Sequence, residues 1–108
     1  MNYKIVPTAD FKSDFKQLYK KFPSLKREIE ELGISLESNP VQGTSIGNNC
    51  YKIRLAIRSK NTGKSGGARV ITHVKIIEQT VYLLSIYDKS DQSTITDKEI
   101  TERIRRIK

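Results

Sequence analysis

The sequence is poor in the residues that build disulfides and metal sites. Its 108 residues include one cysteine, Cys50, and one histidine, His73. A single cysteine excludes an internal disulfide and a multi-cysteine metal site, and a single histidine would need unusual help from carboxylates to hold zinc. Apolar runs are only a few residues long, too short to span a membrane. We therefore expect no metal, no cofactor and no membrane association, and an inert Cys50.

The N-terminal residues lack the apolar stretch and small-residue cleavage site of a signal peptide. We therefore expect a cytoplasmic protein. The length suits a single domain spanning residues 1–108. A hydrophobic content of 36% with 30% charged residues is typical of a globular chain rather than a disordered one.

Acidic residues are absent from the middle of the chain. No Asp or Glu lies between Glu37 and Glu78, and outside this segment 13 of the 20 basic residues nearly balance the 12 acids. Most of the net charge of +8 therefore comes from the central segment. A surface of one sign predicts a polyanionic partner, either a nucleic acid or an acidic protein. The basic residues of the segment are Lys52, Arg54, Arg58, Lys60, Lys64, Arg69 and Lys75.

The first part of the chain has the apolar spacing of two helices. A short strand at 3–7 ends at a proline, and Thr8 can then cap a helix with an apolar stripe. Pro23 breaks this helix, and Ser24 can cap a second one that continues through Gly33. A loop rich in Gly and Asn follows at 43–49. The two stripes are Phe11, Phe15, Leu18, Tyr19 and Phe22, and then Leu25, Ile29, Leu32 and Leu36.

The second part of the chain changes to a period of two, which is typical of strands. Strands are predicted at 50–58, 68–77 and 80–89, the last apolar on both faces as in a central strand. In the first of them, Lys52, Arg54 and Arg58 alternate with apolar residues. In the second, Arg69 and His73 share one face. Residues 96–99 fit a capping box that opens a C-terminal helix.

The predicted fold is therefore α+β, with the order β-α-α-β-β-β-α. Short links between the last three strands favour an antiparallel meander, with the first strand added at one side, so the sheet is mostly antiparallel. We expect the helix hairpin to cover one face of this sheet. The other face would then display Lys52, Arg54, Arg69 and His73.

The stretch NTGKSGGARV, residues 61–70, contains a fragment of a phosphate-binding loop. A Walker A loop would need a glycine where this chain has Arg58, and it would open a helix, whereas a strand follows here. The glycines are better explained by a sharp turn between two strands. Lys60 and Lys64 on that turn can extend the cationic surface, or they can serve solubility.

Three short motifs in the second half of the chain are informative when they are taken together. YKIRL at 51–55, GKSGGARVI at 63–71 and the YLLSIYDK segment at 82–89, followed by a Thr-containing helix start, resemble the RelE/HigB family of bacterial toxins from toxin–antitoxin pairs. The long Lys/Gly loop is similar to the HigB-like branch. The resemblance covers nearly the whole chain and implies a RelE-like fold.

The resemblance also implies a function and partners. Relatives bind the ribosomal A site, where 16S rRNA is a neighbour, and cut mRNA there. They are inhibited by a cognate antitoxin, expected here to be HigA-like with a helix-turn-helix DNA-binding part. Metal-free RNA cleavage uses the 2′-hydroxyl as nucleophile, and Arg and Lys stabilise the charge that develops on the phosphate.

By resemblance, Lys52, Arg54 and Arg69 occupy the family's principal functional positions. His73 and Tyr87 complete the expected catalytic set. RNA contacts are expected from Arg58, Lys60, Lys64, Lys75 and Lys89. Relatives often carry a further Tyr or His near the C-terminus, and this chain has neither after Tyr87.

The residues leave alternatives open for each role. Arg69 could instead form a salt bridge to the C-terminal helix, and Lys52 could be a solvated lysine rather than a base. His73 could be structural or an acid–base group, and Tyr87 could orient or stack a base or fill the core. At the level of the whole protein, the alternatives are a non-enzymatic ParE-like gyrase poison and a general nucleic-acid-binding module.

Overall fold

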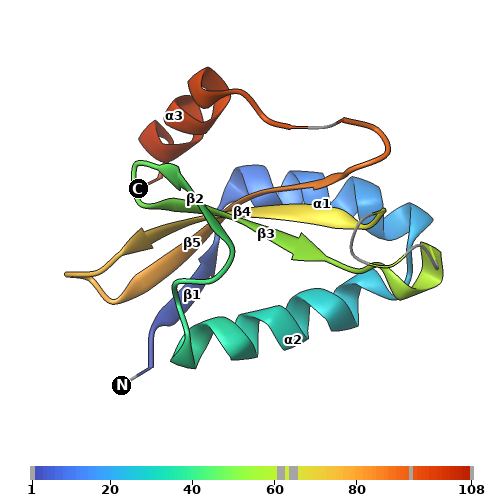
Figure 1. The fold of residues 1–108 in the computed structure, drawn as a ribbon, viewed down its shortest axis with the longest axis horizontal. Coiled ribbons are helices and arrows are strands. Elements are labelled where there is room, and N and C mark those ends of the chain that lie inside the picture. Colours follow the sequence, from blue (N-terminus) through green and yellow to red (C-terminus); the bar gives the residue numbers. More distant parts are fainter. Residues whose placement is uncertain (1, 61–62, 64–65, 93, 108) are drawn as a thin grey trace.

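The computed structural model describes residues 2–60, 63, 66–92 and 94–107. The chain folds as an α+β protein with a helix hairpin, a five-stranded sheet and a C-terminal helix (Figure 1). The predicted element order is confirmed, with one more strand than expected. The elements are β1 (Lys4–Pro7), α1 (Ala9–Lys21), α2 (Leu25–Ser38), β2 (Thr44–Gly47), β3 (Cys50–Leu55), the short 3-10 helix η1 (Arg58–Lys60), β4 (Ala68–Lys75), β5 (Thr80–Asp88) and α3 (Asp97–Arg105).

The strand order in the sheet is β1-β5-β4-β3-β2. Strands β2 to β5 form an antiparallel meander, and β1 adds beside β5 in parallel orientation. The apolar strand β5 therefore has neighbours on both sides, as its sequence predicted. The extra strand β2 lies in the segment predicted as a loop. Asn48 and Asn49 adopt positive φ angles of 55° and 58°, and this tight turn lets β2 pair back onto β3.

The helix hairpin packs on one face of the sheet through a single apolar cluster. Thr8 caps α1 as predicted, because its hydroxyl accepts a hydrogen bond of 3.1 Å from the Phe11 amide. Helix α2 continues through Gly33 as predicted, but Ser24 makes no side-chain cap and instead binds Ser59 and Glu28. The cluster joins Phe11, Leu18, Leu25, Leu32 and Leu36 of the helices to Ile53, Val70, Val74, Val81 and Ile86 of the sheet.

Strand β3 ends earlier than its sequence pattern predicted, and this changes the position of Arg58. The prediction of a strand at 50–58 is wrong beyond Leu55, because the chain bends into η1. The Arg58 amide donates a 2.7 Å hydrogen bond to the buried carboxylate of Glu28. The Arg58 guanidinium pairs with Glu31 of α2 at 3.2 Å. Arg58 therefore turns toward the helix hairpin and leaves the cationic strand face.

The second face of the sheet is covered in part by α3, which the sequence reading did not anticipate. Ile100 of α3 packs with Cys50, Ile71, Leu84 and Tyr87 in a second buried cluster. Figure 1 shows α2 and α3 on opposite sides of the strands. The expectation that this face displays Arg69 and His73 is wrong, because they are only 4% and 7% exposed.

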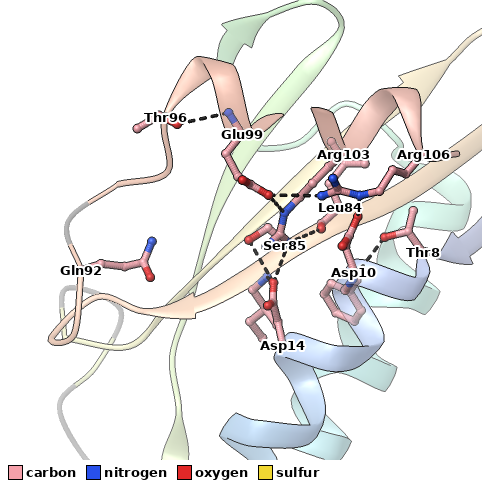
Figure 2. A network of polar contacts seen from close by, with 12 residues as sticks. Thr8, Asp10, Asp14, Leu84, Ser85, Gln92, Thr96, Glu99, Arg103 and Arg106 are labelled. Carbon is pink, nitrogen blue, oxygen red and sulfur yellow. Dashed lines mark hydrogen bonds and ion pairs between the residues drawn. The ribbon is translucent and has the colours of Figure 1, made fainter. Parts of the chain in front are cut away.

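A network of ion pairs attaches α3 to α1 across the edge of this cluster (Figure 2). The Arg103 guanidinium binds Asp14 at 2.7 Å, Glu99 at 2.8 Å and the Leu84 carbonyl at 2.8 Å, and Arg106 binds Asp10 at 2.9 Å. Burial lowers the pKa of Arg103, but the hydrogen bonds to Asp14 and Glu99 outweigh it and hold the guanidinium charged. The network fixes the orientation of α3 on the sheet.

One of the two hydrogen bonds of the predicted α3 capping box forms. The Thr96 hydroxyl accepts a 3.1 Å hydrogen bond from the Glu99 amide, as predicted. The Glu99 carboxylate turns instead to Arg103 and Arg106, and these contacts hold its pKa below the ordinary value. An arginine attracts a carboxylate more strongly than a neutral backbone amide does, which explains the difference.

Candidate functional site

Three of the predicted site residues form one row across the three middle strands of the sheet, close to one end of those strands. Arg54 of β3 pairs with Arg69 of β4, and Arg69 pairs with Tyr87 of β5. Residues directly opposite one another on paired strands point to the same face. Lys52 lies two residues before Arg54 on β3 and therefore shares this face. We call Lys52, Arg54, Arg69 and Tyr87 the basic row.

The members of the basic row differ in burial. The Arg54 side chain is exposed and Lys52 is half-buried, whereas Arg69 is only 4% exposed and donates a 3.1 Å hydrogen bond to the Ala68 carbonyl. Two arginines side by side repel each other, and a polyanion bound over them would relieve this repulsion. The basic row therefore combines the buried guanidinium of Arg69 with the more accessible cations of Lys52 and Arg54 beside it.

Tyr87 contributes a buried hydroxyl to the row. The residue is 6% exposed, and its hydroxyl has no hydrogen-bond partner among the residues that the structure describes. Burial raises the pKa of Tyr87, while the nearby Thr94 hydroxyl and the charge of Arg69 act in the opposite direction. The phenol is therefore neutral at pH 7 and keeps a proton that it can donate.

Thr94 belongs to the site although no sequence pattern indicated it. Lys52 Nζ lies 3.5 Å from Thr94 Oγ1, and the same hydroxyl lies near Tyr87. The segment between β5 and α3 thus returns to the basic row before α3 begins. Residues in a loop show no hydrophobic periodicity, so periodicity could not indicate Thr94. The threonines before the C-terminal helix were the nearest sequence signal to this position.

His73 lies on the same face but apart from the basic row. It is four residues from Arg69 along β4, a distance of about 13 Å in a strand. Its Nδ1 lies 3.4 Å from the Cys50 thiol, directly across the strand pair. Burial lowers the pKa of His73 and raises that of Cys50 to about 11. The two groups are therefore a neutral imidazole and a protonated thiol, and Cys50 belongs to the second buried cluster.

The remaining basic residues of the predicted RNA-binding set are dispersed. Lys60 forms an ion pair with Asp88, binds Ser90 at 2.6 Å and lies 5.8 Å from the centre of the Phe22 ring. Lys75 lies 3.8 Å from Glu78 at the far end of β4, and Lys89 is exposed just after β5. Lys64 lies outside the described residues. The structure thus gathers Lys52 and Arg54 with Arg69, and it holds Lys60 against an acid.

The described residues include no group of three His, Cys, Asp or Glu side chains that could hold a metal ion. Within the same part of the chain, no helix is long and apolar enough to span a membrane. The chemistry that the site itself offers is electrostatic stabilisation by Arg and Lys, together with proton transfer by a phenol or an amine.

The fold and the basic row define a small α+β protein with a cationic sheet face. Solved structures share this fold. A mutant of the E. coli toxin RelE in the free state is 18% identical, with a TM-score of 0.64 and full coverage of both chains. The toxin–antitoxin complex RelBE2 from Mycobacterium tuberculosis is 17% identical, with a TM-score of 0.63, over 84% of this chain and 95% of that one.

A third solved structure shows an E. coli RelE mutant in complex with a peptide of its antitoxin RelB. It is 16% identical, covers all of both chains and has a TM-score of 0.62. No curated protein sequence matches the chain. The family described as "RelE toxin of RelE / RelB toxin-antitoxin system" matches residues 11–107. The chain therefore belongs to the RelE toxin family, as the sequence motifs indicated, while its place in the HigB-like branch stays a prediction.

Proposed function

We propose that this toxin is a ribosome-dependent mRNA endonuclease that inhibits translation. The observation that carries the proposal is the basic row, in which Arg54, Arg69 and Tyr87 lie side by side on three neighbouring strands with Lys52 beside them. The segment that supplies Lys52, Arg54 and Arg69 contains no acid. Its positive electrostatic potential therefore favours binding of a phosphate group. The mRNA would lie over this row in the ribosomal A site, next to 16S rRNA.

The proposed reaction is attack of a ribose 2′-hydroxyl on the adjacent phosphorus. The bond from the 2′-oxygen to phosphorus forms while the bond from phosphorus to the 5′-oxygen breaks. The products are a 2′,3′-cyclic phosphate and a free 5′-hydroxyl. Negative charge develops on the nonbridging oxygens, and Arg54 and Arg69 stabilise that charge more strongly than they stabilise the ground state.

Two protons must move in this step. We propose that Lys52 Nζ accepts the proton of the 2′-hydroxyl. Tyr87 donates a proton to the departing 5′-oxygen, since its phenol is neutral at pH 7 and its hydroxyl has no partner among the described residues. Thr94 orients the Lys52 amine. His73 stays outside the reacting set because it lies about 13 Å from Arg69 along the strand.

Other basic residues and partners complete the proposal. Lys64, Lys75 and Lys89 would guide the RNA backbone toward the row. The ion pairs of Arg58 with Glu31 and of Lys60 with Asp88 favour structural roles for Arg58 and Lys60. The cognate antitoxin would be HigA-like, with an acidic or amphipathic segment that neutralises the cationic face. Toxin, antitoxin and ribosome would meet in the cytoplasm.

The test is cleavage of translated mRNA, mapped by primer extension after the purified toxin is added to a translation extract. We expect cuts in the wild-type reaction and a loss of about 10²–10³-fold in cleavage rate for Arg69→Ala. Arg105→Ala, which removes an exposed arginine of α3, is the matched control and should cut normally. Translation arrest without cleavage would contradict the proposal, and gyrase inhibition in a supercoiling assay would then identify the ParE-like alternative.

Arg69 is buried, so its removal could also disturb the fold. Arg54→Ala provides a second variant, because Arg54 is exposed and its loss leaves the packing intact. We expect it to cut at least tenfold more slowly while its circular dichroism spectrum stays unchanged. A fully active Arg54→Ala protein would remove Arg54 from the proposed mechanism.

A further inference from the structure

Helix α1 carries its acidic and its basic residues on different sides. Its two acids face α3, where Asp10 binds Arg106 and Asp14 binds Arg103. Another side of the helix carries a lysine at every fourth position. We call Lys12, Lys16 and Lys20 the lysine row. All three side chains are exposed, and none has an ion pair among the described residues.

The spacing of the lysine row is regular. A helix rises 1.5 Å per residue, so lysines four positions apart repeat about every 6 Å along its axis. Consecutive phosphates of a nucleotide strand repeat over a similar length. Lysine ammonium groups on flexible stems bind phosphate as point charges, without demanding one orientation. The row can therefore follow a phosphate backbone along the length of α1.

An exposed aromatic ring lies beside the lysine row. Tyr19 belongs to the apolar stripe that the sequence assigned to the core, but it is 41% exposed. Its ring stacks on Phe15 with a centroid distance of 5.5 Å and an interplanar angle of 12°. One part of the Tyr19 ring thus contacts Phe15, and another part of its surface lies in solvent. Surfaces that bind single-stranded nucleic acid combine cations with aromatic rings on which bases stack.

The lysine row and the basic row lie on opposite sides of the molecule. Helix α1 packs on the sheet face that carries Val70 and Val81, whereas the basic row lies on the face that α3 partly covers. In the view of Figure 1, α1 lies behind the strands of the sheet. A protein with cations on both sides suits a narrow space between two polyanionic surfaces.

An acidic protein segment would be a second possible occupant of the lysine row. Protein interfaces of useful affinity normally have an apolar core surrounded by polar residues. The row offers only part of one tyrosine ring in addition to its charges, and it has no arginine for bidentate pairing with carboxylates. These features favour a phosphate backbone over a peptide.

We propose that the lysine row, together with Tyr19, is a second RNA-binding surface that contacts the phosphate backbone of ribosomal RNA. The basic row on the opposite side remains free for mRNA. This inference rests on the proposed function, since it assigns α1 the contact that holds the toxin on the ribosome.

The experiment measures equilibrium binding of the toxin to purified ribosomes at 50 to 200 mM salt. The test variant carries Lys12→Gln, Lys16→Gln and Lys20→Gln, and glutamine keeps the helix propensity of lysine. The control variant carries Lys4→Gln, Arg27→Gln and Lys98→Gln. It removes the same number of exposed charges from β1, α2 and α3, so a general effect of net charge appears equally in both.

We expect the plot of log affinity against log salt to become shallower by about 2 in the test variant, because three phosphate contacts are lost. Its affinity at 50 mM salt should fall about tenfold, while the control should change less than twofold. Tyr19→Leu should weaken binding by about fivefold or more without changing the salt dependence, since stacking carries no charge. An unchanged slope in the test variant overturns the inference.

Two further outcomes separate the inference from the proposed function. If the wild-type protein cuts mRNA but the test variant binds ribosomes normally, only the lysine row is refuted. If the test variant loses ribosome binding although the wild-type protein cuts no mRNA, the row is supported and the nuclease proposal fails. A variant that binds ribosomes normally but no longer binds its antitoxin would assign the row to an acidic protein, and this also overturns the inference.

Discussion

Replacement of Tyr87 by phenylalanine should make the protein more stable and less active. The Tyr87 ring packs with Ile71, Leu84 and Ile100, and phenylalanine preserves this packing. The hydroxyl is buried and has no hydrogen-bond partner among the described residues. A buried polar group without a partner costs about 1–3 kcal/mol, so its removal should recover about 1 kcal/mol.

The magnitude can be checked by thermal unfolding at pH 7, followed by circular dichroism. For a chain of about 100 residues, a gain of about 1 kcal/mol raises Tm by about 4 °C. Tyr82→Phe is the matched control, since the Tyr82 hydroxyl lies on the surface and bonds to Glu78 at 3.4 Å. The control should shift Tm by less than about 1 °C, because such an exposed bond contributes little.

The same preparations give the functional half of the prediction. Tyr87→Phe should cut mRNA about 10²-fold more slowly, because the proton donor to the 5′-oxygen is gone, while Tyr82→Phe should cut normally. A lower Tm in Tyr87→Phe would refute the energetic argument, since it would mean that the hydroxyl forms a stabilising bond, with Thr94 the nearest candidate. Normal cleavage would refute the catalytic role of the hydroxyl, whatever its effect on stability.

Two further predictions concern the surroundings of the site. Burial would raise the pKa of Asp88, but the hydrogen bonds from Lys60 and Ser90 outweigh it and lower the pKa; stability present at neutral pH should therefore be lost as the pH falls below about 4. Urea unfolding between pH 7 and pH 3 should show a weaker pH dependence in Asp88→Asn, and an identical dependence would contradict this. Gly67→Ala should destabilise the protein by about 1–3 kcal/mol, because a Cβ there would collide with the Leu55 carbonyl. Gly33→Ala, which meets open space within α2, is its control in the same unfolding assay and should be stabilising by about 1 kcal/mol.

The sequence was sufficient to predict which residues of the basic row lie together on the sheet. Alternation along a strand placed Lys52 with Arg54, and short links between strands predicted that Arg69 would be their neighbour. The first prediction follows from the two-residue period of a strand, and the second follows from the length of the links between strands. The family model that matches residues 11–107 then confirmed the family that the motifs suggested.

The burial of the site was not predictable in the same way. The stripe of Ile100, Ile104 and Ile107 showed that the last helix has an apolar side, but periodicity does not say which surface that side covers. Arg69 was therefore expected to be exposed, whereas it is only 4% exposed in the folded chain. Thr94 was missed for a related reason, since its position depends on where the loop before α3 crosses the sheet.

The attachment of α3 to α1 has a consequence for the order in which the toxin becomes complete during synthesis. Asp14 and Arg103 are 89 residues apart in sequence, so the contact that fixes the last helix joins the two ends of the chain. Folding of a new chain proceeds from its N-terminal part, and contacts between distant residues close late. The helix hairpin and the sheet can assemble before α3 is made, but the cluster around Tyr87 stays uncovered until Ile100 arrives. Within the described fold, the proposed catalytic surface is therefore the last part to take its shape.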